Sequence, residues 1–194
     1  ERLGYGGDIV STYEAYILNF DMREIYLKIL KDFADEAKDG WITETAPYVG
    51  IKDSGFGKRA GPISWALAVP ELIGALLKHY KEERALDYYP LCAKYVNLVD
   101  NKHPKGIIPQ CIGDHEAIRR APNNVTATAH WYRFVKLTEG FAKRLGKKDD
   151  EKKFGLIAEK IRGAFIKNFV KSDGTIADGT QSAQATGFYL GLVP

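Results

Sequence analysis

A short loop pattern recurs three times along the chain and constrains its fold more than any other feature. Each copy follows a helical stretch and places a glycine two residues before an isoleucine, at Gly40, Gly106 and Gly174, which are 66 and 68 residues apart. A near-constant period that spans two helices is typical of stacked helical hairpins. Gly-x-Ile is also a common helix end with a hydrophobic anchor, so the prediction depends on the spacing rather than on the motif.

Helical periodicity covers most of the chain. Apolar residues recur every three or four positions, as in amphipathic helices, and the alternation typical of strands is nearly absent. We therefore predict an all-α protein. The predicted helices are 9–20, 22–37, 62–80, 84–99, 125–145, 149–170 and 182–192. Within this set, Pro70 predicts a kink, Asn124 an N-cap and Gly146 a helix end.

Long and short connections alternate between these helices. Residues 39–61 and 101–124 form long loops, whereas the turns near Asp21 and Lys147 are short. Stacked hairpins can build an open solenoid or close into a ring, and long loops gathered at one end favour the ring. We predict an (α/α) barrel of hairpins, with its functional residues on the long loops.

The composition excludes several classes of partner. Lys and Arg number 28 against 25 Asp and Glu, a net charge of +3, and the two signs alternate over residues 147–153 as on a solvated helix face. No apolar run approaches the roughly 20 residues of a membrane span. We expect no nucleic-acid or membrane partner. Cys92 and Cys111 are expected to be small buried residues, and no spacing of His, Asp or Glu predicts a metal or a cofactor.

The loops carry groups suited to a carbohydrate substrate. Aromatic faces pack on sugar rings, and cleavage of a glycosidic bond needs two carboxyl groups, one of which donates a proton. The candidate carboxyl groups are Glu1, Asp8, Glu44, Asp114 and Glu116, and the loops also hold Trp41, Tyr48 and His115. Each acid has an ordinary alternative: Asp8 would cap the helix predicted from Ile9, and Asp114 would form an Asx turn in its loop.

The first eight residues, ERLGYGGD, separate Glu1 from Asp8 by a segment too rich in glycine for an ordinary helix. We expect the glycines to let a loop turn tightly. The stretch resembles the ERLGWxGD motif of the inverting α-L-rhamnosidases, glycoside hydrolase family 78. The resemblance covers essentially the whole chain. Its further elements are Trp65 and Pro70, the Gly-Asp-His-Glu run at 113–116, Thr-Ala-Thr at 126–128, Thr-Gln at 180–181 and Gly-Leu-Val-Pro at 191–194.

The resemblance implies a role for several residues. Glu1 would be the general acid, and Asp8 would help bind rhamnose. Tyr5 stands where tryptophan is commoner in the motif and would line the sugar site. His115 stands where many relatives have tryptophan, and Trp65 would form part of the pocket wall.

The resemblance also implies an architecture and an activity. Residues 1–194 would be a single partial domain, the N-terminal half of a six-hairpin (α/α) barrel, with the general base beyond Pro194. The parent protein would hydrolyse terminal α-L-rhamnosyl residues with inversion, and the chain alone would be inactive. The alternatives are another (α/α)-barrel carbohydrate enzyme, such as an unsaturated glucuronyl hydrolase, or a non-catalytic helical-repeat scaffold that binds sugar.

Overall fold

A computed structural model describes residues 3–50, 55–57, 59–109, 111–114 and 117–193. Over these residues the chain is all-α, as predicted, and β-structure is confined to isolated bridges. None of the described helices is long and apolar enough to cross a membrane. The elements are α1 (Gly6–Asn19), α2 (Arg23–Glu36), α3 (Ile63–Ala66), α4 (Ala68–Ala75), the π-helix η1 (Leu76–Tyr80), the 3₁₀-helix η2 (Glu83–Tyr88), α5 (Tyr89–Lys102), α6 (Asn123–Arg144), α7 (Lys148–Phe169) and α8 (Gln181–Tyr189).

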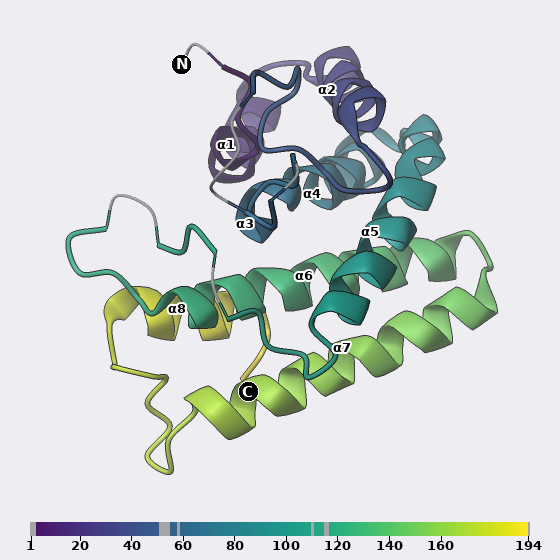
Figure 1. The fold of residues 1–194 in the computed structure, drawn as a ribbon. Coiled ribbons are helices and arrows are strands. Elements are labelled where there is room, and N and C mark those ends of the chain that lie inside the picture. Colours follow the sequence, from purple (N-terminus) through teal and green to yellow (C-terminus); the bar gives the residue numbers. More distant parts are fainter. Residues whose placement is uncertain (1–2, 51–54, 58, 110, 115–116, 194) are drawn as a thin grey trace.

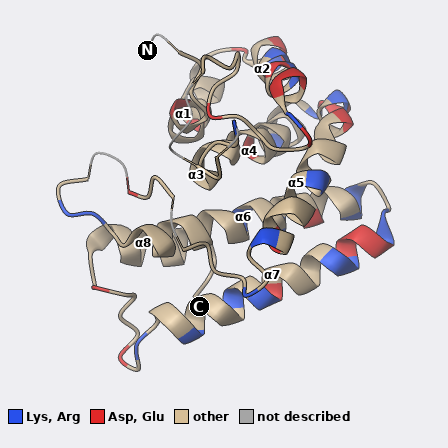
Figure 2. Cartoon of the chain, viewed as in Figure 1, with Lys and Arg blue, Asp and Glu red and all other residues tan. Residues whose placement is uncertain are grey.

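The helices form stacked hairpins in two layers, which confirms the main inference from the repeat (Figure 1). The first members of the hairpins contact one another in the order α1, α3–α4, α6, α8. The second members form the other layer, where α2 contacts η2 and α5 contacts α7. Acidic and basic residues are interspersed along α2 and α7 (Figure 2).

The repeated loops share one backbone conformation. The three repeat glycines have φ angles of +92° at Gly40, +75° at Gly106 and +84° at Gly174. This left-handed region costs glycine nothing, whereas other residues are strained there. Two residues later each loop inserts a fully buried isoleucine: Ile42, Ile108 and Ile176. The glycine reverses the chain and the isoleucine anchors it in the core, so the period in the sequence is also a period in the structure.

Prolines divide two helices that the sequence predicts as continuous. The stretch 62–80 breaks at Leu67 between α3 and α4. Pro70 has no N–H, and its ring conflicts with the carbonyl four residues earlier, so the break falls just before it and the predicted kink is confirmed. The predicted helix 84–99 begins instead as 3₁₀-helix, and α5 begins at Tyr89 with Pro90 in its first turn, where proline is tolerated.

Two predicted N-caps are wrong. Helix α1 begins at Gly6 with Tyr5 as its N-cap, so Asp8 lies inside the first turn. Helix α6 is preceded by Pro122, and Asn124 lies one residue inside it. In both cases the residues before the supposed cap already have helical geometry. The end predicted at Gly146 is confirmed, since this glycine follows α6 with a φ of +68°.

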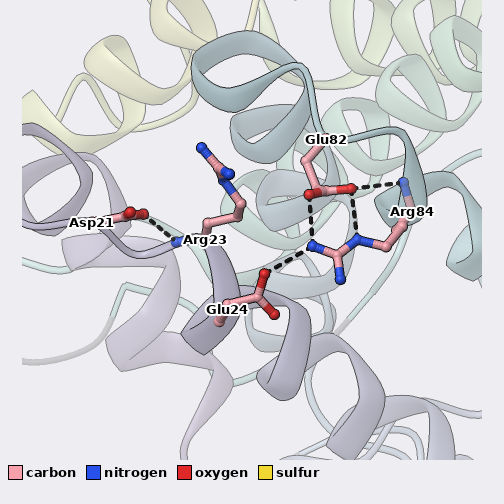
Figure 3. A network of polar contacts seen from close by, with 5 residues as sticks. All are labelled: Asp21, Arg23, Glu24, Glu82 and Arg84. Carbon is pink, nitrogen blue, oxygen red and sulfur yellow. Dashed lines mark hydrogen bonds and ion pairs between the residues drawn. The ribbon is translucent and has the colours of Figure 1, made fainter.

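The short turns lie at the opposite end of the stack from the long loops and are joined by polar contacts. The Arg84 guanidinium contacts the carboxylates of Glu82 and Glu24, each at 2.8 Å (Figure 3). The side chain of Asp21 accepts a hydrogen bond of 3.2 Å from the backbone N–H of Arg23. These contacts link the turn between α1 and α2 to the turn between η1 and η2.

Candidate active site

The motif at the start of the chain lies against the loop that carries Glu44. The backbone N–H of Gly6 donates to the carbonyl of Glu44 at 3.1 Å, and the N–H of Ala46 donates to the carbonyl of Gly4 at 3.0 Å. Two segments about 40 residues apart in sequence therefore run side by side as a short antiparallel contact. The structure brings together two of the regions that the sequence analysis selected separately.

The motif glycines serve close packing as well as the expected tight turn, which occurs at Gly4, where the backbone N–H of Tyr5 donates to the carbonyl of Leu3 at 2.9 Å. None of Gly4, Gly6 and Gly7, all of which are described, has a positive φ angle. A Cβ atom on Gly4 would overlap the carbonyl oxygen of Ala46, and one on Gly6 would overlap the carbonyl oxygen of Trp65. A Cβ on Gly7 would overlap the indole nitrogen of Trp65. The glycines begin α1 and let it approach the first turn of α3.

Tyr5 and Trp65 form an aromatic pair at this junction. Their ring centroids are 5.1 Å apart and the ring planes are inclined by 73°, an edge-to-face arrangement. Both side chains are half-buried, so part of each aromatic surface is open to a ligand. Tyr5 precedes α1 and Trp65 belongs to α3, so the packing of these two helices sets the geometry of the pair. Together they offer the kind of apolar surface on which a sugar ring packs.

Asp8 is exposed in the first turn of α1, next to the glycine that lies under the Trp65 indole. Unpaired backbone N–H groups at a helix N-terminus favour a negative charge there. A carboxylate in this position can accept hydrogen bonds from sugar hydroxyl groups. The proposed acid, Glu1, lies outside the described residues, as do His115 and Glu116.

Glu44 occupies a more enclosed position than a loop carboxylate usually does. Its residue exposure is 4%, and its neighbours Thr43 and Thr45 are fully buried. A Cβ on Gly61 would come within 2.7 Å of the Glu44 Cα, so the loop is held between Gly61 on one side and the motif on the other. Burial is the main cause of the raised pKa of the Cys111 thiol, and the negative charge of Glu44 adds to it.

Cys111 joins the loop of Asp114 to α3, a role that the sequence did not reveal. Its sulfur accepts a hydrogen bond of 3.2 Å from the backbone N–H of Ile63, two residues before Trp65. Both cysteines are buried, as expected. Ile63 lies at the start of α3, where backbone N–H groups lack partners within the helix. The sulfur supplies one such partner and fixes the Asp114 loop near the aromatic pair.

Asp114 is half-buried and closes its own loop. Its Oδ2 atom accepts a hydrogen bond of 3.1 Å from the backbone N–H of Ala121. Burial lowers the pKa of His130, and the nearby Asp114 carboxylate partly opposes this lowering. Asp114 therefore lies near the N-terminal half of α6. Its hydrogen bond closes the loop across seven residues, whereas an Asx turn spans two, so the contact observed is not the Asx turn considered from sequence. Its contact with substrate stays a prediction.

Two loop aromatics from the sequence analysis pack against residues of their own loop, and Trp41 also packs against α5. Trp41 contacts Phe56 and Tyr95, with centroid distances of 5.5 and 5.9 Å. The guanidinium carbon of Arg59 lies 4.1 Å from the Tyr48 ring centroid. These contacts hold the 39–61 loop in shape.

An ion pair between a buried carboxylate and a half-buried guanidinium, beneath this region, was missed from sequence. The guanidinium of Arg133 on α6 donates to both carboxylate oxygens of Glu71 on α4, at 2.7 and 3.0 Å. The hydroxyl of Tyr13 on α1 donates to Glu71 at 3.1 Å. Burial, followed by the Glu71 carboxylate, raises the pKa of Tyr13. Glu71 is a lone acid in the apolar run around Pro70, and this could have indicated a buried charge. The sequence did not reveal its partners because they lie on other helices.

No group of three or more His, Cys, Asp or Glu side chains within the described ranges could hold a metal ion. What the described residues offer is an aromatic pair, an exposed carboxylate beside it and a buried carboxylate in the adjoining loop. That combination can bind a polyol and orient it toward an acid in the motif.

Known α-L-rhamnosidases share this arrangement of helices. The crystal structure of Streptomyces avermitilis alpha-L-rhamnosidase complexed with L-rhamnose has a TM-score of 0.87 and 29% identity to this chain, and the match covers 100% of this chain and 18% of that one. The alpha-L-rhamnosidase from Dictyoglumus thermophilum has a TM-score of 0.86 and 28% identity, covering 100% and 22%. A rhamnosidase from Klebsiella oxytoca with rhamnose bound shares the fold, with a TM-score of 0.76 at 11% identity. The match covers 100% of this chain and 39% of that one.

Sequence comparison leads to the same group of proteins. The curated alpha-L-rhamnosidase of Streptomyces avermitilis is 29% identical over 199 residues, and this chain spans 18% of its length. The family model for the bacterial alpha-L-rhamnosidase six-hairpin glycosidase domain matches residues 1–194. The chain belongs to this family of six-hairpin glycosidase domains.

Proposed function

We propose that this chain supplies the acid side of the active site of an α-L-rhamnosidase that hydrolyses terminal α-L-rhamnosyl residues. One observation carries the proposal: the motif that begins with Glu1 packs through its glycines onto Trp65 and through its backbone onto the Glu44 loop. Family membership and the relative solved with L-rhamnose give the choice of sugar.

In the proposed mechanism, Glu1 protonates the glycosidic oxygen as the bond to the leaving group breaks. Asp8 binds hydroxyl groups of the rhamnose, and Tyr5 and Trp65 provide the apolar wall. A water molecule gives up a proton to the general base as its oxygen bonds to the anomeric carbon, and the products are free rhamnose and the alcohol of the leaving group. For the acid to hold its proton near neutral pH, its pKa must be raised by burial or by a neighbouring carboxylate.

We further propose that the reaction inverts the anomeric centre and that the general base comes from another part of the protein. An inverting site separates its two carboxyl groups by roughly 6.5–9.5 Å to admit a water molecule. The chain spans 18% and 22% of two solved rhamnosidases, which leaves room for the remaining hairpins and the base. The 194-residue chain by itself is then expected to show no rhamnosidase turnover.

The test is hydrolysis of an aryl α-L-rhamnoside by the full-length protein and its Glu1→Gln variant. We expect kcat to fall by roughly 10²–10⁴-fold, since the variant has no proton to donate. The loss should be smaller with a dinitrophenyl leaving group, which departs without protonation. Glu159→Gln, an exposed acid on α7, is the matched control and should keep the parent rate. A Glu1→Gln variant with the parent rate would remove Glu1 as the acid.

A further inference from the structure

A pocket outside the candidate active site lies where α5 and α7 end. We propose that this pocket binds a carboxylate-bearing sugar, such as a uronate residue of a glycan. Its lining comes from the loop that follows α5, residues 102–109, and from Asn168 on α7. The choice of a sugar rests on the proposed function, whereas the choice of a carboxylate rests on the charge of the pocket.

The pocket is large enough for a sugar unit. Its volume is about 470 Å³, within the range of roughly 300–1,000 Å³ common for ligand sites. It lies at the same end of the stack as the long loops, because α5 and α7 both end there. Ile108 anchors the lining loop: it is fully buried, and its backbone N–H donates to the Thr128 hydroxyl at 3.1 Å. The pocket is thus carried by one of the repeated loops.

Positive charge gathers on one side of the pocket. Lys102 and Lys105 supply this charge, and none of the described lining residues of the pocket is acidic. The Lys102 ammonium is held in place, because it donates to the Phe56 carbonyl at 3.1 Å and lies 5.2 Å from the centroid of the Phe56 ring. Burial and then the Lys102 charge lower the pKa of His103. The two lysines, with no described acid beside them in the lining, give the pocket a positive charge that suits an anion.

The rest of the lining favours a ring over a simple anion. Pro104, Ile107 and Pro109 form an apolar wall, on which the C–H face of a pyranose can pack. The Asn168 amide nitrogen donates to the Ala164 carbonyl at 2.7 Å, which turns the amide into a fixed group whose oxygen can accept from a hydroxyl. An inorganic anion would use the lysines and leave the apolar wall uncovered. A uronate uses both.

The experiment measures binding by calorimetry to the full-length protein at low ionic strength, with methyl galacturonide and methyl glucuronide as probes. The methyl ester of each probe removes only the charge, and acetate supplies only the charge. We expect at least one uronate to bind at least about fivefold more tightly than its ester and than acetate. Equal binding of acid and ester, or acetate as tight as the uronate, would overturn the proposal.

Three variants localise the binding. Lys105→Gln should weaken uronate binding at least about fivefold, and Lys105→Arg should restore most of it. Lys152→Gln makes the same charge change at an exposed position on α7 and should leave binding unchanged. An equal loss in both Gln variants would show a general charge effect and sink the assignment.

Rhamnoside hydrolysis serves as a separate readout. Lys105→Gln should leave the hydrolysis of a neutral aryl rhamnoside unchanged, because the lysine lies outside the candidate active site. Uronate binding without rhamnoside hydrolysis would leave the pocket standing and refute the proposed function. Rhamnoside hydrolysis without uronate binding would support the proposed function and refute the proposed uronate pocket.

Discussion

The two ends of the helical stack differ in their direct backbone packing, although the loop end also holds an ion pair, Arg59–Glu36 at 2.6 Å. At the loop end, backbone groups pack directly on one another, as where Gly6 meets Trp65 and Gly61 meets Glu44. At the turn end, long charged side chains such as Arg84 and Glu24 join across the surface (Figure 3). Exposed ion pairs contribute little because water screens them and the side chains lose entropy.

This difference shows where the molecule needs precision. A backbone contact without an intervening side chain fixes distances closely, and the candidate active site is built on such contacts. The turn end needs only to reverse the chain, and charged residues can do that with loose geometry. Between the two ends, the partly buried Glu71–Arg133 pair links α4 to α6. The following substitutions test the contrast, from the largest expected effect to the smallest.

Arg133→Met should cause the largest loss of stability. It leaves the Glu71 carboxylate, 7% exposed, without its guanidinium. We expect a cost of about 2–3 kcal/mol, below that of a fully buried pair because the Arg133 side chain is 37% exposed. Chemical denaturation at neutral pH measures the change in the free energy of unfolding. The double variant Glu71→Gln/Arg133→Met should regain part of the loss because no unpaired charge stays buried. A loss below about 1 kcal/mol would show that this pair behaves like the exposed ones.

Gly6→Ala should be destabilising by about 2 kcal/mol, the usual cost of overpacking. The added Cβ overlaps a backbone carbonyl of Trp65, which cannot rotate away as a side chain can. The control is Gly163→Ala in α7, where no atom lies within 4 Å of the added Cβ. That change should stabilise the protein by about 0.5–1 kcal/mol, because alanine favours a helix over glycine. The two alanines thus have opposite expected signs in the same denaturation measurement, and equal signs would break the comparison.

Arg84→Gln should have the smallest effect and should depend on pH. Hydrogen bonds from the Arg84 side chain lower the pKa of Glu82 to about 2 from its ordinary value of 4.5. Since the folded-state pKa is the lower one, the contact stabilises the protein above pH 4.5 and is lost as the pH falls toward 2. The difference in melting temperature between parent and variant should therefore shrink over that range. A difference that grows on acidification would contradict this assignment.

Much of the fold follows from local patterns. The apolar period and the recurring Gly-x-Ile predicted the helices and their stacking, because each depends on residues close together in sequence. The errors arose where two local signals competed. Asp8 resembled an N-cap, yet the chain is already helical from Gly6, where close packing on Trp65 places the start of α1.

The candidate site was less accessible to sequence analysis. The motif drew attention to Tyr5 and Asp8, but nothing local indicated that Gly6 would pack on Trp65 or that Cys111 would cap α3. The Glu71–Arg133 pair was missed for the same reason, since its members are 62 residues apart.

By itself the sequence determined the helical class, the repeat of hairpins and the motif that carries the proposed acid chemistry. These depend on periodicity and residue type, which act over a few positions. Only the tertiary structure decided why the motif is rich in glycine. Gly4, Gly6 and Gly7 keep ordinary backbone angles, and their missing side chains let α1 and its preceding loop pack against Ala46 and Trp65. Close approach is a property of two segments together, and it appears only when the helices pack.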